Sequence, residues 1–198
     1  MSNGDVSQSR RRFLVGATSV VGGVGVIGAA VPFVSSWQPS ARAQAAGAPV
    51  TVNIEKLEPG QQITVEWRGR PVWILRRTPE MLEGIESLND RLRDPESRNA
   101  AQPDYIQGIF RSLKPEIAVM VGICTHLGCS PEFRPEVAPA DLGPAWLGGF
   151  FCACHGSRYD LAGRVYSNQP APANLEIPPH RFDSEHVLTV GLDPEDAA

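Results

Sequence analysis

Two boxes of sequence, CTHLGC at residues 124–129 and CACHGSRYD at residues 152–160, decide how this chain is organised. Together they contain all four cysteines of the chain and two of its four histidines. Each box places one cysteine close to one histidine and carries one further cysteine. The close pairs are Cys124 with His126 and Cys152 with His155. Two such boxes can supply two thiolates and two imidazoles to one inorganic centre and leave two sulfurs over.

These residue types suit an iron-sulfur centre with mixed ligands. A [2Fe–2S] cluster held by four thiolates has a low potential. Replacing two thiolates on one iron by neutral imidazoles raises the potential to roughly −150 to +300 mV. The Cys-x-His and Cys-x-x-His spacings let each loop give one ligand to each iron, so that two loops would clamp the cluster from opposite sides.

The boxes resemble those of the Rieske iron-sulfur proteins, and specifically of the iron-sulfur subunit of ubiquinol:cytochrome c oxidoreductase, the cytochrome bc complex. The resemblance covers the ligands, the Leu-Gly spacer of the first box and the Gly-Ser-x-Tyr tail of the second. It implies one [2Fe–2S] cluster and, in an oxidising compartment, one disulfide. The implied assignment is Cys124 and Cys152 on one iron, His126 and His155 on the other, and a Cys129–Cys154 bridge.

The resemblance also implies roles for residues around the ligands. Ser157 would donate a hydrogen bond to a bridging sulfide, and Tyr159 would donate one to a ligand cysteine sulfur. Both bonds stabilise the reduced, more negative cluster and so raise its potential. Leu127 would shield the cluster. One departure is Ala153, where the family usually has proline, so this loop has lost some stiffness.

Other sites use the same residue types. A Cys2His2 zinc site is one, and a pair of ordinary disulfides is another. Neither requires the Gly-Ser-x-Tyr tail, which favours the iron-sulfur interpretation. His180 and His186 have no cysteine nearby and are expected to be core or surface residues.

Charge divides the chain. Only Asp5 among the 22 acidic residues precedes residue 49, whereas four of the 18 basic residues do. The remainder is therefore acidic, which argues against a nucleic-acid partner.

Residues 9–14, SRRRFL, resemble the twin-arginine export signal S-R-R-x-F-L, whose pathway moves proteins already folded. We expect residues 1–12 to be a cytoplasmic N-terminus that carries this signal.

A transmembrane anchor is expected at residues 13–34, because no charged residue occurs from Phe13 to Ala41. As a helix, this segment would be about 33 Å long, enough to cross a bilayer. The preceding arginines place the N-terminal end in the cytoplasm. The body would then lie in the periplasm, anchored in a bacterial inner membrane. The alternative is a cleaved signal peptide, because Ala41-Arg42-Ala43 has the small-x-small form of a processing site. We prefer a retained anchor.

Residues 35–49 are small and nearly uncharged and would form a flexible tether, which the resemblance implies is a hinge. Residues 50–198 would form a mainly β, antiparallel Rieske-type domain with a cluster-binding subdomain at about residues 117–180. Short β-branched and aromatic runs predict its strands, and residues 79–92 have helical spacing. The expected strands are 50–54, 63–67, 72–75, 118–123, 146–151 and 186–192.

Three loops complete the expected domain. Residues 93–104 are charged and are expected to be a loop within an insertion, residues 79–114, between early strands. The proline-rich segment 130–144 is expected to be irregular. Residues 163–175 resemble the proline loop that covers the cluster in this family, with Gln169 where a glycine is common.

The resemblance implies one-electron oxidation of a membrane quinol. His126 or His155 would hydrogen-bond the quinol hydroxyl and accept its proton, and the electron would pass to a c-type cytochrome. The expected partners are a cytochrome b subunit and a c-type cytochrome subunit, in a dimeric complex. Two alternatives remain open, namely the Rieske subunit of a periplasmic molybdenum oxidase such as arsenite oxidase, and a structural zinc-binding surface protein. Ring-hydroxylating oxygenase components need neither the anchor nor the second cysteine pair.

Overall fold

The computed structural model describes residues 7–194, and its contacts divide the chain into two units between residues 45 and 46. The first unit contains helix α1 (Gln8–Ser35) and most of the short helix α2 (Ala41–Ala46). The second unit, which we call the head, contains all the strands. The first six residues of the expected cytoplasmic segment 1–12 lie outside the described residues.

Helix α1 is a candidate membrane span by length and composition. It has 28 residues, and none of them is buried within the protein. The hydroxyl of Ser7 caps its N-terminus by accepting a hydrogen bond from the backbone N–H of Arg10. Thr18 satisfies its own hydroxyl by donating to the carbonyl of Leu14 at 2.8 Å, as polar side chains in lipid-exposed helices must. The expected anchor, residues 13–34, falls wholly within this helix.

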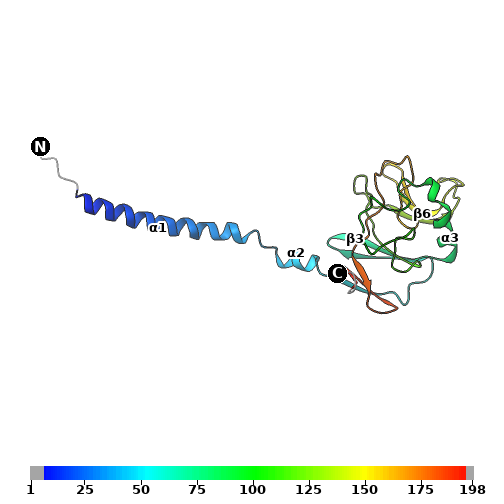
Figure 1. Ribbon diagram of the computed structural model, residues 1–198, viewed down its shortest axis with the longest axis horizontal. Helices are drawn as coiled ribbons and strands as arrows, with labels where there is room; N and C mark the ends of the chain where they lie inside the picture. The colour runs from blue at the N-terminus through cyan, green and yellow to red at the C-terminus, as the bar shows by residue number, and fades with distance from the viewer. Residues whose placement is uncertain (1–6, 195–198) are drawn as a thin grey trace. The chain divides into compact units, whose positions relative to one another are not determined.

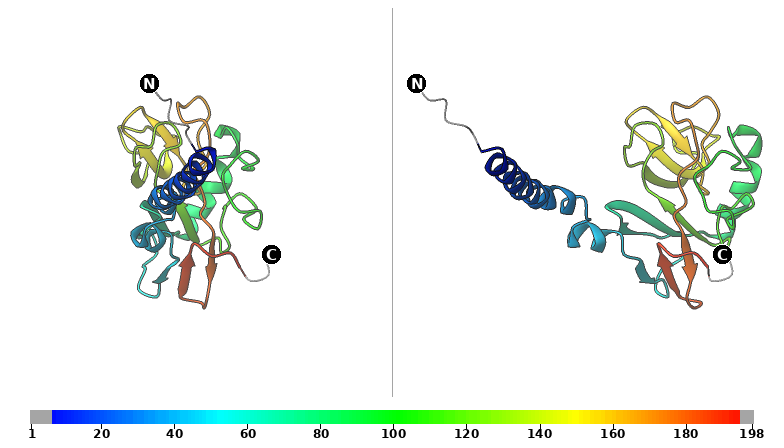
Figure 2. Two further views of the ribbon diagram at one scale, coloured as in Figure 1. Left: turned by 90° about the vertical axis from the view of Figure 1, so that its left-hand side faces the viewer. Right: turned by 60° about the vertical axis from the view of Figure 1, so that its left-hand side comes forward.

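Three antiparallel sheets of three strands each form the described part of the head. One is β1 (Val50–Asn53), β9 (Val187–Val190) and β8 (His180–Phe182), in that order. The second is β2 (Gln62–Trp67), β3 (Arg70–Arg76) and β4 (Ile117–Val121), and the third is β5 (Glu132–Val137), β6 (Leu147–Cys152) and β7 (Ser157–Tyr159). The β1-β9-β8 sheet and the β5-β6-β7 sheet lie at opposite ends of the head (Figure 1 and Figure 2). The expected mainly β, antiparallel fold is confirmed.

Helix α3 (Pro79–Ser87) and the 3-10 helix η1 (Asn89–Arg91) lie between β3 and β4, where an insertion was expected. Two features stabilise the start of α3. Proline stands in its first turn, and the hydroxyl of Thr78 caps it by accepting a hydrogen bond from the backbone N–H of Met81. The helix ends at Ser87, earlier than the expected residue 92. Its last side chain, Ser87, bonds back to the carbonyl of Gly84 and thereby competes with continued helix formation.

The expectation of irregular structure over residues 130–144 is wrong, because β5 occupies part of it. Proline is tolerated in β5 because this is an edge strand of its sheet, and the pairing with β6 is interrupted between Arg134 and Val137. The strands β7 and β8 were not expected either. Both have only three residues, too few to show an alternation in the sequence.

Two apolar cores fill the head. One lies between the sheets β1-β9-β8 and β2-β3-β4 and includes Trp67, Val72 and Leu188. The other joins β3 and β4 to β6 and contains Cys124 and Cys152 together with a stack of Trp73 on Phe150, whose ring centroids are 4.8 Å apart. The cysteine boxes are therefore supported by packed side chains rather than by mobile loops alone.

A substitution in β6 tests this packing. A Cβ at Gly149 would overlap the carbonyl oxygen of Tyr159 in the neighbouring strand, and the φ angle of +156° strains any other residue. We expect Gly149→Ala to destabilise the head by roughly 2 kcal/mol or more in denaturant unfolding. The matched control is Gly84→Ala in α3, where the new Cβ would meet Leu147 only at 3.6 Å, so no loss is expected. Equal stability of the two variants would contradict this account of the packing.

Candidate metal centre

Both boxes form loop tips at the ends of strands. The first follows β4, and the second spans the end of β6 and the turn into β7, where Cys152 pairs with Ser157. Each tip turns through a glycine with positive φ, +84° at Gly128 and +81° at Gly156, which L-residues with side chains rarely adopt. The backbone N–H groups of these glycines donate to the carbonyls of Cys124 and Cys152, at 3.1 and 2.8 Å. The same turn therefore shapes both boxes.

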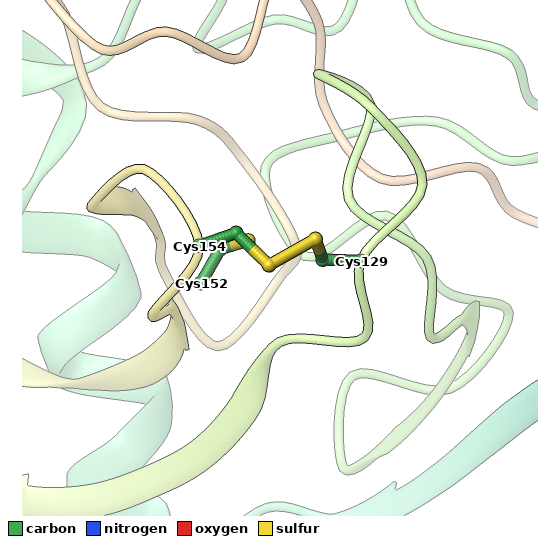
Figure 3. Close-up of side chains that lie close together, drawn as sticks. All are labelled: Cys129, Cys152 and Cys154. Carbon is green, nitrogen blue, oxygen red and sulfur yellow. A yellow bond between two sulfur atoms is a disulfide. The ribbon is translucent and has the colours of Figure 1, made fainter.

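A disulfide joins the two loops. Cys129 and Cys154 are bonded, with Cα atoms 6.7 Å apart, and Figure 3 shows Cys152 beside this bridge. The expected Cys129–Cys154 bridge is confirmed. The sulfurs of Cys129, Cys152 and Cys154 lie within 4.8 Å of one another, but two of them are consumed by the bridge. Cys124 and Cys152 remain free thiols, so the interpretation with two disulfides is wrong for this structure.

The two free thiols lie in the interior of the head, and the two histidines lie at its surface. Cys124 and Cys152 are each 2% exposed, within the apolar core. Burial raises the pKa of Cys152, and a hydrogen bond with Cys124 raises it further. The rings of His126 and His155 meet edge to face with centroids 4.7 Å apart, and His155 is exposed while His126 is half-buried. The structure therefore brings the two expected sulfur ligands together in the core, and it brings the two expected histidine ligands together at the surface of the head.

This donor set fits a [2Fe–2S] cluster of the mixed type. Thiolates are the sulfur ligands that iron-sulfur clusters use, and Cys124 and Cys152 are both free to serve as such ligands. Separation of the sulfur donors from the imidazole donors matches a cluster with one sulfur-held and one nitrogen-held iron. A Cys2His2 zinc ion would use the same four groups, so the donors alone leave zinc possible.

Hydrogen bonds around the inner thiols add a feature that zinc does not require. The hydroxyl of Tyr159 lies 3.2 Å from Cys124 Sγ and accepts from the backbone N–H of Thr125 at 3.2 Å. Burial raises the pKa of Tyr159, so the phenol keeps its proton and can donate it. Ser157 is fully buried, and its Oγ accepts from the backbone N–H of Ala171 at 3.0 Å, which leaves its own proton free to be donated.

The segment 163–175 lies against both boxes, as the expected proline loop would. Ala171 contacts Ser157 of the second box, and the carbonyl of Ala173 accepts from Thr125 Oγ1 of the first at 2.6 Å. Thr125 was missed in the sequence because it stands between two ligands and has no motif of its own. The feature that could have pointed to Thr125 is its hydroxyl group, which can donate a hydrogen bond to the carbonyl of Ala173 in the proline loop.

Buried charges behind the boxes were also missed. Asp160 and Arg164 form an ion pair in which both side chains are 0% exposed. Arg164 further donates to the carbonyl of Ile85 at 2.7 Å and so ties the second box to helix α3. Asn174 is 1% exposed and joins the proline loop to the insertion by donating to the carbonyl of Asp94 at 2.9 Å. The only signal for the ion pair in the sequence is the i, i+4 spacing of opposite charges.

The structure also places the other residues that were named in the sequence analysis. Leu127, which follows His126 in the first box, is 71% exposed. Ala153 is exposed in the turn of the second box. His180 is buried with its Nδ1 2.8 Å from the carbonyl of Pro178, and burial lowers its pKa. His186 is exposed. Neither histidine contacts the boxes through any hydrogen bond of the described residues.

Removal of the bridge gives a stability prediction. A disulfide between residues 25 apart should contribute about 3 kcal/mol by restricting the unfolded chain. We therefore expect the double substitution Cys129→Ser with Cys154→Ser to lower the denaturant midpoint while both inner thiols remain. Denaturant unfolding of the oxidised wild type, the reduced wild type and the double variant measures this. The reduced wild type should resemble the variant, and three identical midpoints would show that the bridge does not stabilise the head.

Comparison with known families removes the ambiguity about the metal. Residues 48–179 match the family described as "Rieske [2Fe-2S] domain", and residues 1–40 match the one described as "Ubiquitinol-cytochrome C reductase Fe-S subunit TAT signal". The chain is therefore expected to carry one Rieske [2Fe–2S] cluster. The N-terminal match and helix α1 fit a membrane-anchored subunit.

Curated relatives agree over nearly the whole chain. The "Ubiquinol-cytochrome c reductase iron-sulfur subunit" of Allochromatium vinosum is 56% identical over 98% of this chain and 93% of its own length. The protein of the same name from Bradyrhizobium diazoefficiens is 40% identical over 92% of this chain and 94% of its own. The "Cytochrome b-c1 complex subunit Rieske, mitochondrial" of Saccharomyces cerevisiae is 35% identical over 94% of this chain and 78% of its own. The two boxes, the antiparallel fold and these similarities show that the chain belongs to the family of Rieske iron-sulfur subunits of ubiquinol-cytochrome c reductases.

Proposed function

We propose that this chain is the high-potential electron-transfer subunit that oxidises a membrane quinol by one electron and passes the electron to a c-type cytochrome. The observation that carries the proposal is the arrangement of the two boxes, which each hold one buried free thiol, are joined by the disulfide, and bring their histidine rings to 4.7 Å from each other. The ligands we assign are Cys124 and Cys152 on one iron and His126 and His155 on the other. When bound, the cluster supplies reversible one-electron chemistry.

Residues around the proposed cluster would bind the quinol, accept its proton and exclude water. His155, exposed at the tip, and the half-buried His126 each have a second ring nitrogen that can face the quinol hydroxyl and take up its proton. Leu127, next to His126, presents an exposed apolar side chain, which would exclude water and suits an apolar quinol pocket in a partner protein. The proline loop covers the inner side through the bonds to Thr125 and Ser157.

Tyr159 is proposed to tune the potential. Its hydroxyl lies 3.2 Å from Cys124 Sγ, and a hydrogen bond to a ligand sulfur favours the reduced, more negative state. We expect Tyr159→Phe to lower the midpoint potential while the cluster is retained, and Ser157→Ala to do the same. The control is Tyr166→Phe, because the Tyr166 hydroxyl is buried with no hydrogen-bond partner. Redox titration followed by electron paramagnetic resonance measures the shift. An unchanged or raised potential in Tyr159→Phe would contradict the assigned bond.

The membrane arrangement is part of the proposal. Residues 13–34 would be a retained anchor with residues 1–12 in the cytoplasm, and the cluster domain at residues 50–198 would lie in the periplasm. Residues 35–49, which include helix α2, would be the hinge on which the head moves between a cytochrome b subunit and a c-type cytochrome subunit. The complex would be a dimer. A mature chain that begins near residue 44 in mass spectrometry would contradict the retained anchor.

Purification of the chain with its natural partners tests the function. We expect b-type and c-type haems to co-purify, and we expect added quinol to reduce the cluster in isolated membranes. Co-purification with molybdenum instead of haem would favour the oxidase alternative, against which the N-terminal family match argues. A colourless, redox-silent protein with bound zinc would refute the proposal.

A further inference from the structure

The interior of the head has an unusual charge balance. Within residues 7–194, the buried charged side chains are three guanidinium groups and one carboxylate, namely Arg77, Arg111, Arg164 and Asp160. The charges of Asp160 and Arg164 cancel in their ion pair at 2.7 Å. Arg77 and Arg111 are left without a buried carboxylate of their own. Such burial is costly, and it occurs here in a head whose sequence is acidic overall.

Carbonyl oxygens hold these two guanidinium groups in place. Arg77 donates to the carbonyls of Phe110 and Pro115, both at 3.0 Å. Arg111 donates from Nη2 to the carbonyl of Leu175 at 2.7 Å and from Nη1 to that of Ala162 at 3.0 Å. Neutral carbonyls accept hydrogen bonds from the Nη groups but do not cancel the charge, and the buried Nε of Arg77 has no partner among the described residues.

Both groups keep their positive charge at neutral pH. Burial lowers the pKa of Arg77 to about 9, and it lowers the pKa of Arg111 to about 10. Nearby Asp160 acts in the opposite direction on both, because its negative charge favours the protonated form. The interior therefore holds a net positive charge.

Arg111 is linked to the first box through the proline loop, because it donates to the carbonyl of Leu175 at the end of that loop. Its acceptors Ala162 and Leu175 belong to the same apolar core as Cys124 and Cys152. Leu175 also closes the proline loop, whose Ala173 receives the bond from the first box. The Arg111 side chain is 0% exposed, so its positive charge is screened much less than a charge at the surface.

We propose that Arg111, supported by Arg77, raises the reduction potential of the cluster, because the buried arginines of the head outnumber its one buried carboxylate and leave positive charge in the interior that carries the sulfur ligands. Two ferric ions, two sulfides, two thiolates and two neutral imidazoles sum to zero, so the added electron leaves one negative charge on the cluster. A fixed buried cation stabilises that charge without any reorganisation. The inference rests on the proposed cluster site, and it assigns to the arginines a contribution separate from the hydrogen bonds of Ser157 and Tyr159.

Charge can be separated from hydrogen bonding by two variants at one position. Arg111→Met removes the charge, and Arg111→Lys keeps the charge but breaks the forked bonds to Ala162 and Leu175. Arg77→Met provides a second neutral variant at a separate position. Arg98→Met is the surface control, because Arg98 has a side chain that is 77% exposed and paired with Glu96. Redox titration of full-length protein in membranes, followed by electron paramagnetic resonance, gives each midpoint potential. Partly loaded samples also report it, because a midpoint potential does not depend on the amount of cluster.

We expect Arg111→Met and Arg77→Met to have lower midpoint potentials than the wild type, with unchanged resonance positions. The midpoint potential of Arg111→Lys should stay closer to that of the wild type than the midpoint potential of Arg111→Met does. The midpoint potential of Arg98→Met should equal that of the wild type. The inference is overturned if the neutral variants titrate at the wild-type potential, or if Arg111→Lys falls as far as Arg111→Met. If Arg111→Met fails to fold, Arg77→Met decides in the same way. A wild-type protein without the cluster signal would refute the proposed function instead.

Discussion

Replacing Cys124 by serine is expected to abolish the cluster. Serine is nearly isosteric with cysteine, but its hydroxyl is a far weaker ligand for iron than a thiolate. The side chain is 2% exposed and packs in the core, so no other group can take its place. We expect the low-temperature electron paramagnetic resonance signal of the reduced protein, and its iron and acid-labile sulfide, to fall to background.

The control for this variant is the double substitution of Cys129 and Cys154 by serine. It also removes sulfur from the boxes but leaves all four proposed ligands. It should retain a resonance signal of the same type, although the protein unfolds more easily. A Cys124→Ser protein with full signal would show that this thiol is not a ligand.

Substitution of Asp160 by asparagine is expected to destabilise the head by about 3–5 kcal/mol, the typical cost of removing one partner from a buried ion pair. Both side chains of the pair are 0% exposed, so Arg164 would be left charged without its carboxylate. Asp160 also accepts from the backbone N–H groups of Ala162 and Arg164, at 2.9 and 2.8 Å, and shapes the turn after the second box.

Denaturant unfolding of the full chain measures this loss. Asp141→Asn is the matched control, because Asp141 is paired with Arg134 while its side chain is 60% exposed. A surface pair of this kind contributes little, so the control should unfold close to the wild type. Two variants with the same small effect would show that the buried pair does not support the second box.

The boxes could be predicted from the sequence because ligand chemistry demands particular residues at particular spacings. Cys129 bonds to Cys154, as the family resemblance of the boxes implied, and Cys124 and Cys152 remain free thiols. Short strands such as β1 and β2 were also predictable, since β-branched residues alternate with polar ones there.

The supporting structure could not be predicted, and the reasons are physical. An arginine is usually solvated, so nothing in the sequence marks Arg111 as buried. Its burial is made tolerable by acceptors that include the carbonyls of Ala162 and Leu175, which are distant in sequence. Strand β5 contains Pro135, a residue that argues against a strand unless that strand lies at an edge. Edge position is a property of the sheet rather than of the segment.

The most direct test of the account is the low-temperature electron paramagnetic resonance spectrum of isolated membranes that contain the full-length chain, recorded after mild reduction. We predict the signal of a reduced [2Fe–2S] centre with mixed sulfur and nitrogen ligands, at a high midpoint potential. Membranes that hold the chain in quantity but give no such signal, with no iron or acid-labile sulfide in the purified protein, would contradict it.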